Sequence, residues 1–225
     1  MTEQVDRRAD TTRRQILRAA SHQFAHKAYG LVSLDDILAE AEVTKGAMYF
    51  HFRSKHALAV AIIEHRAAVA RHAADELVAR KLSGLETLID FSYLMAVDDI
   101  GDVSTRAGLN LLESIGRTDG LQASVLGEWV STFAEIGRRA VGEGDIVEER
   151  DPDDIARLLV SMYMGLRQTS NFAEPKRFLH DLEMGWTLVL PGFANPDRLE
   201  YFTQFLRRRT ALAIKKATPL RSDTL

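Results

Sequence analysis

The residues best suited to chemistry lie in one short segment, residues 33–55, which reads SLDDILAEAEVTKGAMYFHFRSK. Thr44, Lys45, Tyr49 and His51 bring a hydroxyl, an ammonium, a phenol and an imidazole within two turns of one short helix. Such groups bind phosphate oxygens and the edges of bases. Because no acidic residue lies beside them on that helix, nucleic-acid contact is a better interpretation than acid–base catalysis. Residue types alone also allow a solvated short helix with a half-buried tyrosine.

A glycine in the same segment favours close approach to another molecule. Gly46 disfavours a helix by roughly 1 kcal/mol relative to alanine, but its bare backbone lets the helix come near a second backbone or a groove edge. The apolar residues around it are expected to form a small core. They are Ile37, Leu38, Ala41, Val43, Met48 and Phe52.

Three helices are expected to position these groups. They cover residues 11–28, 34–41 and 45–51, with apolar residues at helical spacing in the first. Ser33 and Asp36 make a loose capping arrangement for the second helix, and Thr44 is placed to cap the third. Ser54 can cap a long fourth helix. The pattern therefore predicts a helix-turn-helix.

The remainder of the chain also predicts helices, because strand signals are few and β-branched residues are scattered. Asp151-Pro152 is a strong start signal for one of them. We therefore expect an all-α protein with two domains. The first is a three-helix domain over residues 1–56, and the second is a helical domain over residues 57–225 that ends in a frayed tail, residues 217–225.

Composition limits the class of protein. The 225 residues include no cysteine, which excludes thiol catalysis, zinc–thiolate sites and disulfides. A chain of this length with 46% apolar residues can form a stable core without such links. It has no run of about 18 apolar residues and no apolar signal-peptide core near its start. A soluble, cytoplasmic protein is expected.

The net charge of −3 argues against a nucleic-acid partner only when the chain is taken whole. Residues 1–56 hold nine Lys and Arg against seven Asp and Glu, a net charge of +2, whereas the rest holds twenty against twenty-five, a net charge of −5. The acidic excess therefore belongs to the second domain, and the first is mildly basic.

The sequence resembles the TetR family of bacterial transcriptional repressors. The run VTKGAMYFHFRSKHAL is similar to the family's recognition helix and the turn after it, and RRQILRAASHQFAHKAYGLVSLDDILAEAEV is similar to its first two helices. The resemblance implies a three-helix DNA-binding domain followed by an all-helical domain for ligand binding and dimerisation. It also implies a homodimer that binds a palindromic operator and is released by a small effector.

The same resemblance implies which residues of the recognition helix contact DNA. Thr44, Lys45 and Gly46 match its start, where bases and phosphates are touched. Tyr49 and His51 match the pair that grips the DNA backbone.

Further DNA contacts are implied on either side of the recognition helix. Lys55 matches a basic residue that contacts phosphate, and Ser33 matches the cap of the second helix, whose free N–H groups can point at a phosphate. Arg7, Arg8 and Arg13 form an arm that either reaches a minor groove or stays disordered.

Four later fragments resemble the γ-butyrolactone receptor-type repressors of actinomycetes in their order and spacing. They are STRAGLNLLES, GEWVSTFAEIGRRAV, ARLLVSMYMGLRQTS and EMGWTLVLPGFANPDRLEYF. The resemblance implies that Trp129 lines a ligand pocket and that Ser161 is a partner for a lactone carbonyl. Phe133 and Leu109 are expected to line the same pocket. A core aromatic is the other interpretation of Trp129, and packing is expected for Trp186.

Other classes of function find little support. The pairs His22 with His26 and His65 with His72 have no Glu-x-x-His or cysteine nearby, so no metal and no other cofactor is expected. Two acidic clusters are expected to be solvated loops and helix starts. They are Asp98, Asp99 and Asp102, and Glu148, Glu149, Asp151, Asp153 and Asp154. No nucleophile–base pair or phosphate loop occurs, so an enzyme is not expected. Three alternatives are left. The first is a pseudo-receptor that answers to another metabolite or to none, the second is an α-helical enzyme with an incidental helix-turn-helix, and the third is a helical interaction module that never touches DNA.

Overall fold

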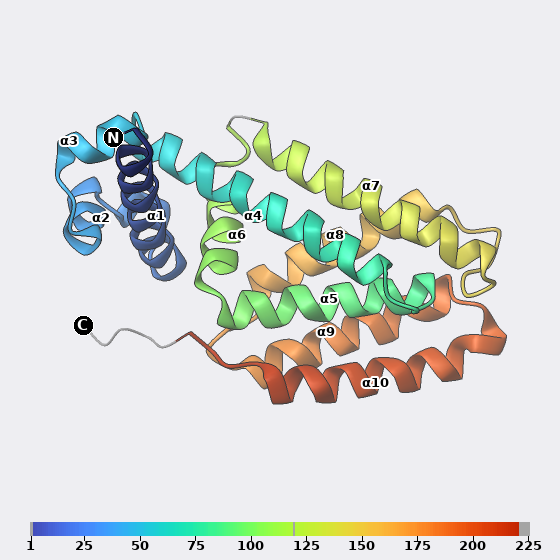
Figure 1. Ribbon diagram of the computed structural model, residues 1–225. Helices are drawn as coiled ribbons and strands as arrows, with labels where there is room; N and C mark the ends of the chain where they lie inside the picture. Colours follow the sequence, from blue (N-terminus) through green and yellow to red (C-terminus); the bar gives the residue numbers. More distant parts are fainter. Residues whose placement is uncertain (1, 119, 221–225) are drawn as a thin grey trace. The chain divides into compact units, whose positions relative to one another are not determined.

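The computed structural model describes residues 2–118 and 120–220 (Figure 1). Helices dominate this part of the chain, and its one β-bridge joins Ile146 to Ala194. The elements are α1 Thr2–His26, η1 Tyr29–Leu31, α2 Leu34–Ala41, α3 Lys45–His51, α4 Lys55–Val78, α5 Gly84–Gly101, α6 Val103–Ile115, α7 Leu121–Gly142, α8 Pro152–Thr169, α9 Pro175–Val189, η2 Leu190–Gly192, η3 Pro196–Arg198 and α10 Leu199–Lys216. The expected all-α architecture is confirmed. Within the described residues, no helix is long and apolar enough to span a bilayer.

The first helix begins at Thr2, well before its expected start at Thr11. Residues 2–10 contain neither proline nor glycine, so nothing in them ends a helix. Arg7 and Arg8 therefore belong to α1 rather than to a separate arm, and their side chains lie outside the part of the chain that is described.

The chain packs into two compact units. The first contains α1, η1, α2, α3, α4 up to Val69, and α6, and the second contains α4 from Ala70, α5, and the helices from α7 onward. The boundary expected between residues 56 and 57 divides the chain by function, and it remains a prediction. The boundary between the two compact units lies inside α4, between Val69 and Ala70. The chain re-enters the first unit at α6.

The first unit has a core of its own. Ile16 and Phe24 of α1 are buried together with Ile37 of α2, Met48 of α3 and Leu58 of α4. The residues expected to form a small core around α2 and α3 are buried, except Val43, which is half-buried. On α6, the side-chain amide of Asn110 donates to the Phe24 carbonyl at 3.1 Å. The core therefore packs the short helices α2 and α3 against the longer helices α1 and α4.

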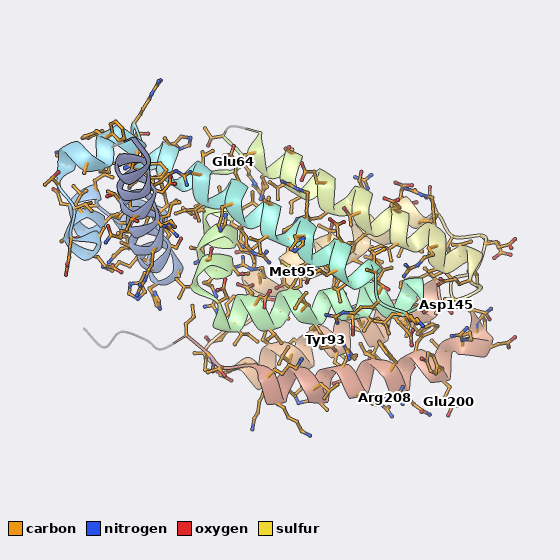
Figure 2. All side chains as sticks on the ribbon, in the orientation of Figure 1. Glu64, Tyr93, Met95, Asp145, Glu200 and Arg208 are labelled. Atoms are coloured by element: carbon orange, nitrogen blue, oxygen red, sulfur yellow. The ribbon has the colours of Figure 1, made fainter. Side chains whose placement is uncertain are left out.

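The second unit is built around α5, most of whose residues are buried. The carboxylate of Asp99 on α5 accepts from Nε of Arg167 on α8 at 2.5 Å, and both side chains are almost completely buried. The expectation that Asp99 lies in a solvated loop is therefore wrong, because its charge is paired inside the unit. The Tyr163 hydroxyl donates to the same carboxylate at 3.3 Å. Tyr93, labelled in Figure 2, lies on the α10 side of α5, where its hydroxyl and that of Thr210 are 2.6 Å apart in a hydrogen bond. Polar links thus tie α5 to α8 and α10.

The expected frayed tail divides into two parts. Residues 217–220 leave α10, and the Leu220 N–H donates to the Ile100 carbonyl at 3.2 Å. Residues 221–225 lie outside the described residues.

Candidate nucleic-acid interface and effector cavity

The start of α2 is fixed by a reciprocal pair of hydrogen bonds. The Asp36 N–H donates to Oγ of Ser33 at 3.0 Å, and the Ser33 N–H donates to Oδ2 of Asp36 at 3.2 Å. Hydrogen bonding to Ser33, first by its side chain and then by its backbone, lowers the pKa of Asp36. In the capping bond the Ser33 hydroxyl oxygen accepts, while its O–H hydrogen is the donor that bonds the Asp36 carboxylate and lowers its pKa.

The turn between α2 and α3 depends on a residue in the left-handed region. Glu42 has φ 54° and ψ 38°, and the Val43 N–H donates to the Leu38 carbonyl at 3.2 Å. Thr44 then caps α3, because its Oγ1 accepts from the Ala47 N–H at 3.2 Å. The cap expected at Thr44 is present, and in this bond the hydroxyl keeps its donor hydrogen.

The α3 helix is anchored on one side and open on the other. Met48 is completely buried, whereas Tyr49 is 46% exposed and Phe50 is 78% exposed. Lys45 and Gly46 are also exposed. A methyl group built on Gly46 would meet only Oγ1 of Thr44, at 4.0 Å. The open side therefore presents donors, an aromatic surface and a bare backbone.

Two neighbours of this open side differ from expectation. Sequence reasoning missed Phe50, although a residue two positions after Met48 in a helix lies about 200° from it and so faces outward when Met48 is buried. His51 is half-buried, and its ring packs edge-on against Phe50 with centroids 5.0 Å apart. His51 is therefore positioned by Phe50 as well as by its own helix.

Lys55 has a different environment from the one its expected role requires. Its ammonium donates to the carbonyls of Tyr29 at 2.9 Å and Val32 at 2.8 Å, and it lies 4.2 Å from the centre of the Tyr29 ring. Only one of its three N–H groups remains for a phosphate. The structure thus assigns Lys55 first to holding the segment between α1 and α2, and phosphate contact becomes a secondary role.

The third arginine of the expected arm also packs locally. The guanidinium of Arg13 lies 5.3 Å from the centre of the Phe52 ring, which is buried at the end of α3. Arg13 therefore connects α1 to the end of α3 rather than forming part of a loose arm.

The histidines of α1 are engaged without converging on a common point. Nδ1 of His22 lies 2.8 Å from Oε1 of Glu40, and Nδ1 of His26 lies 2.9 Å from the His22 carbonyl oxygen. Across the described residues, no group of three or more His, Asp or Glu side chains is arranged to hold a metal ion.

The second unit contains the cavity nearest to the expected ligand pocket. We call it the effector cavity after the role that the sequence predicts for it. Its lining residues are Phe91, Ser92, Met95, Trp129, Phe133, Leu159, Val160 and Tyr163. Its volume is about 20 Å³, which is room for about one water molecule. The indole N–H of Trp129 is buried and has no hydrogen-bond partner among the residues that the structure describes.

Two of the four expected pocket residues lie elsewhere. Trp129 and Phe133 line the effector cavity, but Ser161 is exposed on α8 and Leu109 is buried in the first unit. Val160, which precedes Ser161, takes the position in the lining that was expected for the serine. Two lining residues carry hydroxyls: that of Ser92 donates to the Leu88 carbonyl at 3.0 Å, and that of Tyr163 donates to the Asp99 carboxylate.

Comparison with known proteins identifies relatives for both units. The family model for bacterial regulatory proteins of the tetR family matches residues 16–62. The chain is 27% identical over 195 residues to the A-factor receptor protein of Streptomyces griseus, which covers 84% of this chain. The match covers 66% of that relative, slightly less than two thirds of its length.

Solved structures extend the similarity over nearly the whole chain. A gamma-butyrolactone receptor described as ArpA-like has a TM-score of 0.75 and 30% identity, covering 91% of this chain and 99% of that one. CprB from Streptomyces coelicolor, in complex with its biological operator sequence, has a TM-score of 0.76 and 30% identity over the same shares. The similarity thus includes a relative whose structure contains operator DNA.

Proposed function

The chain belongs to the TetR family of bacterial regulatory proteins, in its butyrolactone-receptor group, and we propose that it is a repressor released from its operator by a small effector. It binds a palindromic operator as a homodimer, in the cytoplasm where that DNA lies. The observation that carries this proposal is the open side of α3, where exposed Lys45 and Tyr49 flank a glycine with free space around it.

The donors on α2 and α3 contact different parts of the DNA. Lys45 and Gly46 enter the major groove at the start of the recognition helix, where base edges are read. Tyr49 and His51 hold the phosphates beside it. Ser33 adds the N-terminus of α2, whose free N–H groups favour an anion.

Two copies are needed because one reading domain is only weakly basic. With a net charge of +2, residues 1–56 gain little from general attraction to DNA. A two-fold dimer reads two half-sites one helical turn or a multiple apart. Exposed apolar side chains on α8 and α9, namely Leu158, Met184 and Leu188, support dimerisation through these two helices.

The effector acts through the effector cavity of the second unit. The unpaired indole N–H of Trp129 and the aromatic ring of Phe133 suit a small amphipathic molecule that carries a carbonyl oxygen, such as a γ-butyrolactone. A cavity of about 20 Å³ does not hold such a molecule, so the effector binds an expanded state. Release from DNA then requires that the expanded state bind the operator less tightly.

Replacing Tyr49 by Phe and His51 by Ala together tests the interface. We expect loss of operator binding in a gel shift, because both phosphate donors are removed while buried Met48 and Phe52 still anchor α3. The operator is first obtained by selecting bound sequences from random duplexes. Circular dichroism and gel filtration should show an unchanged fold and dimer, and unchanged operator affinity would exclude this site.

Two further measurements separate the alternatives. Binding to the selected duplex should fall steeply with salt if phosphates are contacted, and an interaction module that avoids DNA would show no such specific complex. Adding γ-butyrolactones to the formed complex should release the DNA. A pseudo-receptor would keep the operator bound at every concentration tested.

A further inference from the structure

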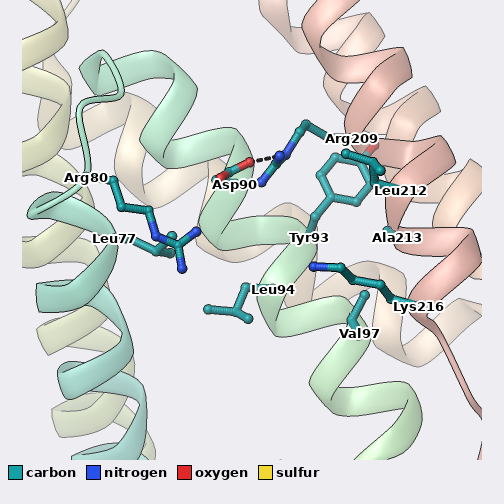
Figure 3. Close-up of a pocket in the computed structure, with 10 residues that line it drawn as sticks. All are labelled: Leu77, Arg80, Asp90, Tyr93, Leu94, Val97, Arg209, Leu212, Ala213 and Lys216. Carbon is teal, nitrogen blue, oxygen red and sulfur yellow. Dashed lines mark ion pairs between the residues drawn. The ribbon is translucent and has the colours of Figure 1, made fainter.

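A second cavity in the α5-containing unit brings three cationic side chains together. It lies between the C-terminal end of α4, α5 and α10, and its volume is about 140 Å³ (Figure 3). Arg80, Arg209 and Lys216 line it. Asp90 is the one carboxylate among the described lining residues, so the lining carries a net charge of +2.

The Asp90 carboxylate is paired with one of the three cations, Arg209. Asp90 is only 3% exposed and forms an ion pair with Nε of Arg209 (Figure 3). Burial raises the pKa of Asp90, and the charges of Arg209 and Arg80 oppose that shift. The positive charges of Arg80 and Lys216 therefore exceed what Asp90 neutralises.

These two remaining cations face the same space. Figure 3 shows the guanidinium of Arg80 and the ammonium of Lys216 directed toward the middle of the cavity from opposite sides. Both residues are exposed, so water solvates them in the absence of a ligand. A guanidinium offers a planar fork for a carboxylate, and an ammonium adds a compact second charge.

The floor of the cavity is apolar, which selects against a purely ionic ligand. It is formed by Leu77, Leu94, Val97, Leu212 and Ala213. The ring of Tyr93 adds to it, while its hydroxyl is bonded to Thr210. An apolar cavity of roughly 150 Å³ holds benzene, so the volume here suits an apolar body of about six carbons.

We propose that this cavity binds a small monocarboxylate whose apolar body is about the size of a benzene ring. The carboxylate lies between Arg80 and Lys216, and the body packs on Leu77, Leu94 and Val97. None of these residues lines the effector cavity or belongs to the DNA-contacting segment. The site is therefore independent of the proposed repressor function.

Benzoate is the probe, titrated into the full chain by calorimetry. We expect one benzoate per chain. Benzamide has the same shape without the charge, and inorganic phosphate has charge without an apolar body, so each should bind at least tenfold more weakly. Equal binding of benzamide, or no binding of benzoate at millimolar concentration, would overturn the proposal.

Matched variants locate the site. Lys216→Met and Arg80→Met each remove a charge but keep an apolar stem, and each should weaken benzoate binding at least tenfold. Lys215→Met makes the same change at an exposed neighbour outside the cavity and should bind benzoate like the wild type. Circular dichroism checks that all three fold. Loss of binding in Trp129→Phe with full binding in Lys216→Met would place benzoate in the effector cavity and reject the second site.

Discussion

Replacing Gly46 is predicted to change the stability of the protein and its affinity for the operator in opposite directions. In the free protein a methyl group fits there without a clash, since the nearest atom to it is 4.0 Å away. Gly46→Ala should therefore raise the free energy of unfolding by roughly 1 kcal/mol, the usual gain from alanine inside a helix. Operator affinity should nevertheless fall at least tenfold, because the methyl group occupies space needed by the groove.

The chain offers a matched control for that substitution. Gly127 is exposed in α7, and a methyl group added to it would also meet nothing within 4 Å. Gly127→Ala should give a similar stability gain in urea denaturation with unchanged operator affinity. If Gly46→Ala bound the operator like the wild type, close approach at Gly46 would be the wrong explanation for that glycine.

Substitutions of two lysines in the first unit are predicted to have different effects on stability and on operator binding. Lys55→Met leaves the carbonyls of Tyr29 and Val32 without their donor, so the free energy of unfolding should fall by about 1–3 kcal/mol. Lys45→Met removes the same charge from an exposed position and should leave stability unchanged while weakening operator binding. Urea denaturation and gel shifts on both variants provide the comparison. A fully stable Lys55→Met variant would leave phosphate contact as the role of Lys55.

At the scale of elements, the capping of α2 makes a pH dependence predictable. Bonds to Ser33 lower the pKa of Asp36 below its ordinary value of 3.8. The stabilisation by ionised Asp36 is therefore complete above that value and is lost as pH falls through the lowered pKa. The difference in unfolding free energy between the wild type and Asp36→Asn should shrink as pH drops below about 4.

Titration of the carboxyl by NMR tests the same point directly. Replacing Ser33 by Ala should raise the pKa of Asp36 toward 3.8, since the bonding side chain is gone. Asp35→Asn, one position away, is the control for removing a charge from the same turn. A pKa of Asp36 unchanged by Ser33→Ala would show that the Ser33 side chain does not lower it.

Local features of these elements could be predicted from sequence, whereas distant contacts could not. Caps at Ser33, Thr44 and Ser54 join atoms three residues apart, so residue types reveal them. The partners of Lys55 lie 23 and 26 residues away and depend on how α4 packs. Ser161 shows a second limit: neighbouring residues in a helix point about 100° apart, so a shift of one residue exchanges an exposed side chain for the cavity-lining Val160.

At the scale of the whole molecule, Trp129 should affect release from DNA but not DNA binding itself. Trp129→Phe keeps an aromatic ring in the cavity and removes the indole N–H. The effector concentration for half-release should rise several-fold, up to about tenfold, which corresponds to one hydrogen bond of about 1 kcal/mol. Gel shifts with increasing γ-butyrolactone measure this change, and operator affinity without effector should stay the same.

Trp186 provides the comparison for this prediction. Its indole N–H is likewise buried without a partner in the described part of the chain, yet it does not line the effector cavity. Trp186→Phe should therefore retain the effector response. Equal loss in both variants would attribute the effect to general loosening of the second unit instead of to a contact with the effector.

The small volume of the effector cavity also has a consequence for the timing of the response. If the effector enters only after the cavity around Trp129 and Phe133 has opened, the observed association rate rises with effector concentration at first and then levels off at the opening rate. Above that concentration, more signal no longer shortens the delay before the operator is vacated. The speed of induction is then a property of how Phe91, Trp129 and Phe133 pack, while the abundance of the signal decides only whether induction occurs.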